Sequence, residues 1–285
     1  MYTTLITPEQ LMTLQQTQQA LMVFDCSYEL MKPAEGEQQY LSAHIVNAQR
    51  ADLSRHLSAQ EGAASASGGR HPLPTREQFS AWLAGLGFQQ DMQAVVYDRQ
   101  NSGQCGRLWW MLKWVGHEAV AVLDGGLQAW QAAGGALQTG AAMSSRPSTF
   151  ATSQVCAQLV TTEQVVRQLG RPSQTLVDAR SAQRYRGEVE PLDPVAGHIP
   201  GALNRPFNFN LTADGKFKPA EQLRAEFVEL LAGRDPATVV HQCGSGVSAI
   251  PNLLAMEIAG LGRTGLYAGS WSEWCRDPAR PIAQG

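Results

Sequence analysis

The sequence predicts an α/β protein of two similar domains, each with a mainly parallel sheet flanked by helices. Short apolar runs alternate with helix-like stretches, which is typical of parallel strands joined by helical crossovers. The order of these elements occurs twice along the chain. Five residues also recur in the second half at a constant separation of 144, namely Val95/Val239, Val96/Val240, Gly116/Gly260, Gly125/Gly269 and Trp130/Trp274. We interpret this repetition as the duplication of one scaffold.

Length and composition agree with two soluble globular domains. The 285 residues suffice for two domains of about 140 each. Hydrophobic residues make up 44% and charged residues 16%, and the net charge of -3 argues against nucleic acid or an acidic membrane as partner. No apolar run approaches the roughly 20 residues of a membrane span. The first ten residues lack the features of a secretory signal.

The cysteines predict a reducing location. There are five of them, an odd number without CxxC spacing. We therefore expect reduced thiols in a cytoplasmic protein, with neither a disulfide framework nor a metal site, and no pattern in the sequence calls for a cofactor.

The elements of the first half follow from local signals. Thr7 and Pro8 open a helix as N-cap and first residue. The spacing of apolar residues then predicts the following segments: strands at 21–25, 94–98 and 119–123, helices at 75–86 and 108–115, and a short helix at 125–130. Residues 58–72 are rich in Ala, Ser and Gly and predict a mobile loop.

The second half repeats this order after a stretch of small and polar residues. We place domain boundaries at residues 1–135 and 159–285, with 136–158 as the linker. Thr161 opens a helix as Thr7 does, and residues 175–178 form a strand that ends on Asp178, as the earlier strand ends on Asp25. The segments at 44–48 and 198–202 begin with His44 and His198; because they recur in both halves, we expect these histidines to be structural.

The stretch from Thr238 to Ala249 carries the chemistry. An apolar strand ends on Cys243, and the loop Gly244, Ser245, Gly246, Val247 and Ser248 leads into a helix. Glycines permit close backbone approach, and the backbone N–H groups of such a loop, with a helix start behind them, can hold a thiolate or another anion. Position 243 aligns with Arg99 in the first half, so we predict one catalytic and one non-catalytic domain. The competing interpretation is that Cys243 is a small buried hydrophobe.

These motifs closely resemble the rhodanese family of sulfurtransferases. The segment Cys-Gly-Ser-Gly-Val-Ser-Ala at 243–249 is similar to the active-site loop of the 3-mercaptopyruvate members. Residues 178–180, 184–187, 197–202 and 267–274 resemble the other signatures of the catalytic domain. The resemblance covers nearly the whole chain and implies two tandem rhodanese-like domains.

The resemblance implies sulfur transfer through a persulfide on Cys243. The thiolate attacks the outer sulfur of a small anionic donor, and a thiol, thioredoxin or cyanide then accepts that sulfur. The loop contains no basic residue, which favours 3-mercaptopyruvate as donor over thiosulfate, the runner-up. We expect no membrane or nucleic-acid partner and a monomer, because fused domains can bury their shared interface within one chain.

Several further residues are assigned by matching motif positions. Arg184 matches the family arginine that binds the donor's carboxylate, and a guanidinium suits that group. Arg186 is a nearby alternative for donor binding, and Asp178 with Arg180 is expected to brace the loop. Mercaptopyruvate enzymes commonly carry a second arginine where this chain has Asp193, and the resemblance associates an acid there with thiosulfate-type relatives. We therefore expect a weaker donor clamp or a broader donor preference, and Asp193→Arg should strengthen the clamp.

A proton relay is the last feature implied. Ser245 matches a family serine proposed to act with a histidine, which His71 matches, and with an acid whose position falls at Ser54, beside Asp52. His71 could protonate the leaving enolate, or it could be a solvated loop histidine.

Two other functions remain as alternatives, a phosphatase and a non-catalytic carrier. A cysteine phosphatase would need an arginine in its loop, and none lies between Cys243 and Arg263. A non-catalytic sulfur carrier would not need the intact loop. Trp109, Trp110 and Trp114 fall near an apolar helical stripe and are expected to pack in the core. The cysteines outside the loop (Cys26, Cys105, Cys156 and Cys275) are expected to be inert, with a redox role open for Cys105.

Overall fold

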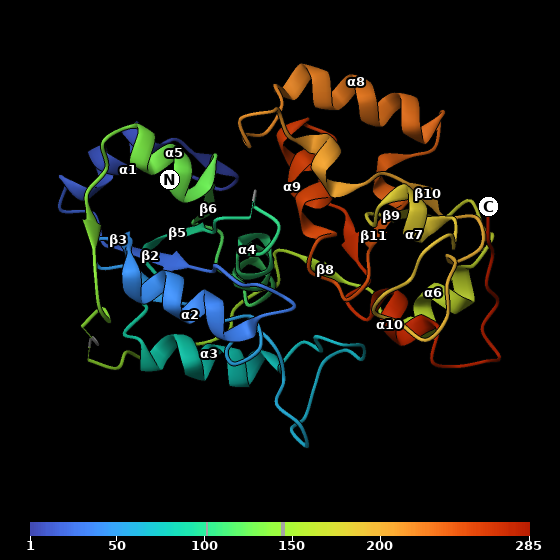
Figure 1. Ribbon diagram of the computed structural model, residues 1–285, viewed down its shortest axis with the longest axis horizontal. Helices are drawn as coiled ribbons and strands as arrows, with labels where there is room; N and C mark the ends of the chain where they lie inside the picture. The colour runs from blue at the N-terminus through green and yellow to red at the C-terminus, as the bar shows by residue number, and fades with distance from the viewer. Residues whose placement is uncertain (101, 144–145) are drawn as a thin grey trace. The chain divides into compact units, whose positions relative to one another are not determined.

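The computed structural model describes residues 1–100, 102–143 and 146–285, which form two compact units (Figure 1). Unit 1 comprises Met1–Ala64, Pro74–Cys156 and Ala213–Lys216. Unit 2 comprises Ser65–Leu73, Ala157–Thr212 and Phe217–Gly285. The structure thus groups residues 65–73, which come from the first half of the sequence, with the second unit. The domain boundaries drawn from the sequence stay a prediction, and Ser144 and Ser145 of the linker lie outside the described residues.

Unit 1 is built on a parallel sheet of five strands. The strand order is β1-β6-β5-β2-β4, and every neighbouring pair is parallel. Its strands are β1 (Leu5–Ile6), β2 (Leu21–Asp25), β4 (Gln49–Arg50), β5 (Gln93–Tyr97) and β6 (Val120–Leu123). Its helices are α1 (Pro8–Gln15), α2 (Pro33–Ser42), α3 (Arg76–Gly85), α4 (Cys105–Trp114) and α5 (Gly126–Ala132). A separate antiparallel pair joins β3 (His44–Ile45) to β7 (Leu137–Gln138).

Unit 2 repeats this plan. Its five-stranded sheet has the order β10-β9-β11-β12-β8, again parallel throughout. The strands are β8 (Gln158–Leu159), β9 (Thr175–Asp178), β10 (Leu203–Asn204), β11 (Val239–Gln242) and β12 (Gly265–Leu266). The helices are α6 (Thr162–Gln168), α7 (Ala182–Tyr185), η1 (Phe207–Asn210), α8 (Ala220–Leu231), η2 (Pro236–Thr238), α9 (Ile250–Ile258) and α10 (Ser270–Trp274). Read from the opposite edge, each strand has a counterpart in unit 1, with β11 in the central place of β5.

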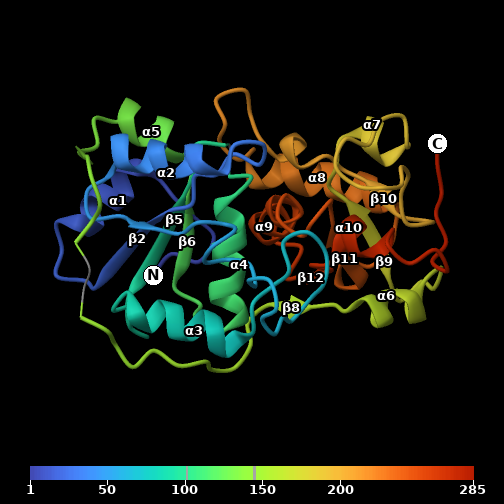
Figure 2. The ribbon, with the colours of Figure 1, turned by 60° about the horizontal axis from the view of Figure 1, so that its bottom comes forward.

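Helices cover both faces of each sheet. In unit 1, α1 and α5 lie on one side and α3 and α4 on the other (Figure 2). The first side buries Leu11, Val95 and Trp130 in one apolar cluster. In unit 2, α6 and α10 cover one face, where Val165, Val240 and Trp271 pack together, and α8 and α9 cover the other (Figure 1). The fold predicted from the sequence is confirmed.

Local signals act alike in both halves. Thr7 and Thr161 each cap a helix through a capping box, and in each the threonine hydroxyl accepts from the N–H three residues on. The His44 ring stacks on the ring of Tyr40, with 4.2 Å between the ring centroids, and His44 Nδ1 lies 2.9 Å from the Tyr40 carbonyl oxygen in a hydrogen bond. His198 stacks on Tyr185 at 3.8 Å and bonds its carbonyl at 2.8 Å. The structural role expected for these histidines is confirmed.

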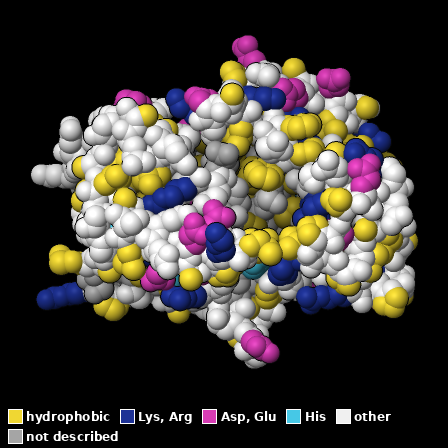
Figure 3. All heavy atoms as spheres, viewed as in Figure 1, with side chains coloured by type: hydrophobic (Ala, Val, Ile, Leu, Met, Phe, Trp, Pro, Cys, Tyr) yellow, Lys and Arg dark blue, Asp and Glu magenta, His cyan; other side chains and the backbone are white. Residues whose placement is uncertain are grey.

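Burial and surface charge also follow the sequence. Trp109, Trp110 and Trp114 are buried, as expected. Figure 3 shows basic and acidic side chains interspersed over the face it draws, in keeping with the small net charge. No helix in the described ranges is both long and apolar enough to cross a membrane. The segment predicted as a mobile loop lacks regular structure, but its last part is tied down: the Ala66 N–H donates to the Leu73 carbonyl and the Leu73 N–H to Ser67 Oγ.

Candidate active site

Cys243 follows the central strand of unit 2. β11 lies between β9 and β12, and Cys243 at its end is only 1% exposed. Three hydrogen bonds fix the start of the loop to α10: the Cys243 N–H donates to Ser270 Oγ at 3.1 Å, and the N–H groups of Trp271 and Ser272 donate to the carbonyls of Cys243 and Gly244 at 3.0 and 2.9 Å. The buried sulfur is therefore held on a fixed backbone.

The loop that follows can only be built with a glycine at position 246. Its φ is +70°, and a Cβ added there would lie 2.2 Å from the carbonyl oxygen of Ala268. Within the described residues, the backbone N–H groups of Gly244, Ser245, Val247 and Ser248 have no protein acceptor. Unbonded N–H groups at the start of a helix suit an anion beside Cys243.

Ser245 and His71 meet, as the sequence predicts. Ser245 Oγ and His71 Nδ1 are 2.9 Å apart, and each residue is 7% exposed. His71 is thus a buried partner of the loop, and the interpretation as a solvated loop histidine is wrong.

The segment that carries His71 is anchored on α10. The Arg70 N–H donates to Ser272 Oγ at 2.9 Å, and the Gly68 N–H donates to Glu273 Oε2 at 3.2 Å. A Cβ on Gly69 would lie 2.6 Å from the Gly269 carbonyl oxygen, so the close approach requires glycine. Ser272 binds Gly244 through its N–H and Arg70 through its hydroxyl, and so fixes the distance between the two segments.

Two guanidinium groups reach the same point of the loop. A Cβ built on Gly244 would lie 3.1 Å from Arg70 Nη2 and 3.4 Å from Arg184 Nη1. Arg184, on α7, was anticipated from the sequence, whereas Arg70 was missed. Its position directly before His71 was the one signal available. Despite the acid at position 193, two cations lie beside the cysteine loop.

Buried acids hold these cations. Glu190 accepts from Arg184 Nη2 at 2.7 Å, and its side chain is 3% exposed. Asp193 accepts from Arg70 Nη1 at 2.6 Å and from Arg184 Nη2 at 3.3 Å. Burial alone would raise the pKa of Glu190, but Arg184 and the N–H of Leu192 lower that pKa below its ordinary value. Glu190 therefore stays ionised and keeps Arg184 in place.

Asp178 and Arg180 lie at the base of the loop. Arg180 Nη2 donates to Asp178 Oδ2 at 2.6 Å and to the Gly197 carbonyl at 2.8 Å. Asp178 pairs with Gln242 across β9 and β11, which places it next to Cys243. Burial alone would lower the Arg180 pKa, but the carboxylates of Asp178 and Glu190 raise that pKa. This geometry suits the supporting role expected from the sequence.

Arg186, the alternative residue for donor binding, is not brought to the loop. Its guanidinium is exposed and pairs with Glu188 at 2.6 Å. Ser54 shares a hydrogen bond with Tyr28, and Asp52 pairs with Arg50, all within unit 1. Burial raises the pKa of the Cys26 and Cys105 thiols, and nearby carboxylates raise it further.

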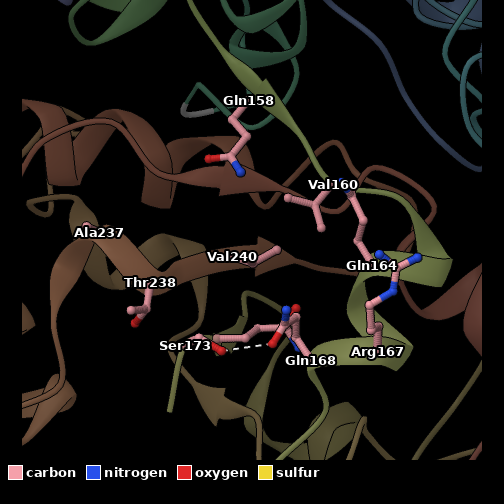
Figure 4. Close-up of a pocket in the computed structure, with 10 residues that line it drawn as sticks. Gln158, Val160, Gln164, Arg167, Gln168, Ser173, Ala237, Thr238 and Val240 are labelled. Atoms are coloured by element: carbon pink, nitrogen blue, oxygen red, sulfur yellow. Dashed lines mark hydrogen bonds between the residues drawn. The ribbon is translucent and has the colours of Figure 1, made fainter. Parts of the chain in front are cut away.

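A cavity of about 250 Å³ in unit 2 lies at the other end of β11 (Figure 4). Its walls include Thr238 at the end of η2, Val240 of β11 and four glutamines, Gln158, Gln164, Gln168 and Gln174. Ser173 donates to Gln168 within it at 2.8 Å. The lining contains no cysteine or histidine, so we assign the chemistry to the Cys243 end of the strand.

Comparison with known proteins identifies the scaffold. The model of the rhodanese-like domain matches residues 7–133 and again residues 161–277. The chain belongs to the rhodanese-like domain family. The two matches coincide with the two repeats, and the second contains Cys243 in its loop. The predicted duplication and the predicted family are both confirmed.

Full-length relatives are sulfurtransferases. A Pseudomonas aeruginosa protein named "Probable 3-mercaptopyruvate sulfurtransferase" is 46% identical over 97% of this chain and 98% of its own length. A Mus musculus thiosulfate sulfurtransferase is 32% identical over 93% of this chain and 89% of its own. The solved structure of a Leishmania major 3-mercaptopyruvate sulfurtransferase has a TM-score of 0.80 and 32% identity, covering 96% of this chain and 74% of that one. This rhodanese-like protein is a sulfurtransferase, with a sulfur donor and a sulfur acceptor.

Proposed function

We propose that the protein takes the thiol sulfur of 3-mercaptopyruvate as the sulfane sulfur of a persulfide on Cys243, passes it to a thiol, thioredoxin or cyanide, and releases pyruvate. One observation carries the proposal: unit 2 places a buried cysteine, unbonded loop N–H groups, the Ser245–His71 pair and two guanidinium groups together. Each meets a need of this reaction, since the donor is an anionic thiol whose carbon leaving group must be protonated.

The first half of the reaction forms the persulfide. Arg70 and Arg184 bind the donor's carboxylate, and the Cys243 thiolate attacks the donor's sulfur. A sulfur–sulfur bond forms while the carbon–sulfur bond breaks, and its electron pair goes to the carbon as the enolate of pyruvate. The proton of the donor's thiol returns to that carbon through Ser245 and His71, which leaves an anionic persulfide on Cys243. The N–H groups of Gly244, Ser245, Val247 and Ser248, which have no acceptor among the described residues, stabilise that charge.

The second half returns the enzyme to its starting state. The acceptor's thiolate or cyanide attacks the outer sulfur of the persulfide, and the bond to Cys243 breaks with its electron pair left on the cysteine. Sulfur is transferred without net oxidation of the enzyme. Because Cys243 is 1% exposed, an acceptor must reach into the site.

Thiosulfate is the second candidate donor. It would leave sulfite, a stable anion that needs no protonation, so the buried Ser245–His71 pair would have no task. This pair and the loop without a basic residue favour mercaptopyruvate. We further propose that the protein is a cytoplasmic monomer.

The test measures pyruvate from 3-mercaptopyruvate with a thiol acceptor, and thiocyanate from thiosulfate with cyanide in parallel. We expect a higher kcat/KM for mercaptopyruvate. Cys243→Ser should lower turnover of both donors at least a thousandfold, on the order of other nucleophile deletions. Cys156→Ser is the matched control and should stay active. Turnover by Cys243→Ser, or no pyruvate from the wild type, would contradict the proposal.

A further inference from the structure

Asp193 lies between the two arginines that face the cysteine loop. Its Oδ1 accepts from Arg70 Nη1 at 2.6 Å, and its Oδ2 accepts from Arg184 Nη2 at 3.3 Å. The side chain is 4% exposed, and the Asp193 N–H donates to Glu190 Oε1 at 3.2 Å. A buried carboxylate with one oxygen on each of two guanidinium groups sets the distance between them.

The guanidinium nitrogens nearest to Gly244 are two that Asp193 does not bind. A Cβ at that position would lie 3.1 Å from Arg70 Nη2 and 3.4 Å from Arg184 Nη1, while Arg184 Nη2, which Asp193 does bind, follows at 3.6 Å. Neither Arg70 Nη2 nor Arg184 Nη1 has an acceptor among the described residues. Asp193 thus contacts one edge of each guanidinium and leaves another edge of each directed at the loop beside Cys243.

We infer that Asp193 is a positioning residue that joins Arg70 and Arg184 into one clamp for the donor's anionic group. The inference rests on the proposed function, because it assigns that clamp to the donor. It reverses the expectation from the sequence that Asp193 marks a missing clamp residue. The second cation comes from Arg70, and Asp193 is what holds it.

Charge balance supports this role. The cluster contains three guanidinium groups, Arg70, Arg180 and Arg184, and three carboxylates, Asp178, Glu190 and Asp193. Without Asp193, two guanidinium groups close to one point would repel each other and move apart. An arginine at position 193 would add a third positive group there. Asp193→Arg should therefore weaken the clamp.

The decisive variant is Asp193→Asn, which keeps the size of the side chain and removes its charge. We expect KM for 3-mercaptopyruvate to rise about tenfold with kcat within about twofold of the wild type, because the reacting groups are untouched. Asp193→Glu should recover part of the loss, and Asp193→Arg should raise KM as well. The matched control is Asp277→Asn, which removes a carboxylate from the exposed pair with Arg280 and should leave KM unchanged.

A binding measurement separates this inference from the proposed function. Calorimetric titration with pyruvate, which carries the same carboxylate, should give about tenfold weaker binding to Asp193→Asn. The double variant Asp193→Asn with Arg70→Gln should lose less binding free energy for pyruvate than the sum of the losses in the two single variants. An inactive wild type whose pyruvate affinity still depends on Asp193 would overturn the proposed function alone. Unchanged pyruvate affinity in Asp193→Asn, or a lower KM in Asp193→Arg, would overturn the role of Asp193.

Discussion

The two units carry the same loop after the same strand, and they differ in what fills it. Ser102 and Gly246 have φ of +62° and +70° at positions 144 apart. In unit 1, the Asp98 carboxylate accepts four hydrogen bonds of 2.8–2.9 Å from the loop, donated by the N–H groups of Gln100, Ser102, Gln104 and Cys105. In unit 2, the same position is Gln242, which is buried and has no partner for its amide within the described residues. In unit 1 the loop N–H groups thus bind a carboxylate of the protein itself, whereas in unit 2 no carboxylate stands at that position and the loop N–H groups can bind the reacting sulfur. Asn101 of the unit 1 loop lies outside the described residues.

A second difference concerns the guanidinium that braces the strand ends. In unit 2, Arg180 binds Asp178 and the Gly197 carbonyl. In unit 1, the equivalent Asp25 and the Ala43 carbonyl bind a guanidinium that comes from Arg99, the residue aligned with Cys243. A guanidinium binds these two groups in both units. In unit 1 it comes from the residue aligned with Cys243, whereas in unit 2 it comes from Arg180. This leaves position 243 available for a nucleophile.

The largest expected effect comes from moving the unit 1 anion into unit 2. Gln242→Asp would place a carboxylate beneath the loop, where it would accept hydrogen bonds from the loop N–H groups and repel the Cys243 thiolate. Like charges a few Å apart cost about 2–4 kcal/mol, so we expect kcat to fall roughly a hundredfold. Pyruvate formation is the assay. Gln242→Asn introduces a side chain of the same size as aspartate but without charge, and this variant should keep most activity. Equal activity in the two variants would show that charge at this position does not matter.

A smaller effect is expected from the positive φ of the unit 2 loop. Gly246→Ala must place its Cβ against the Ala268 carbonyl in a left-handed conformation. We expect a loss of about 2–3 kcal/mol of unfolding free energy, measured by urea denaturation, together with lost activity. A variant as stable as the wild type would mean that the loop can adopt a different path.

The smallest effect is expected at the matching position of unit 1. Ser102 holds φ +62° without being glycine. Ser102→Gly should relieve that conformation and raise the unfolding free energy by up to about 1 kcal/mol, with kcat unchanged. Denaturation and the pyruvate assay on one sample would check both; lower stability or altered turnover would argue that the Ser102 side chain has a further role.

Sequence reasoning predicted the duplicated fold and the cysteine loop because these depend on local patterns. Capping at Thr7 and Thr161, apolar strands and a glycine-bearing loop are each visible within a few residues. The Ser245–His71 pair was anticipated from the family motif. Arg186 was expected near the donor, and the structure pairs it instead with Glu188 at the surface.

The rest depended on contacts between distant parts of the chain. Arg70 and Asp193 are 123 residues apart, and the sequence around neither residue predicts their ion pair. The use of Asp98 and Arg99 to fill the unit 1 site also requires knowing where side chains point. Periodicity gives the face of a strand, but it does not give the partner of a charged group.

The central claim is that Cys243 alone of the five cysteines accepts the donor's sulfur. The most direct test treats the protein with one equivalent of 3-mercaptopyruvate without acceptor and examines its peptides by mass spectrometry. We predict one added sulfur atom per chain, on the peptide that contains Cys243, with one pyruvate released. Added sulfur on Cys105 or another cysteine, or pyruvate released without added sulfur on Cys243, would contradict the account.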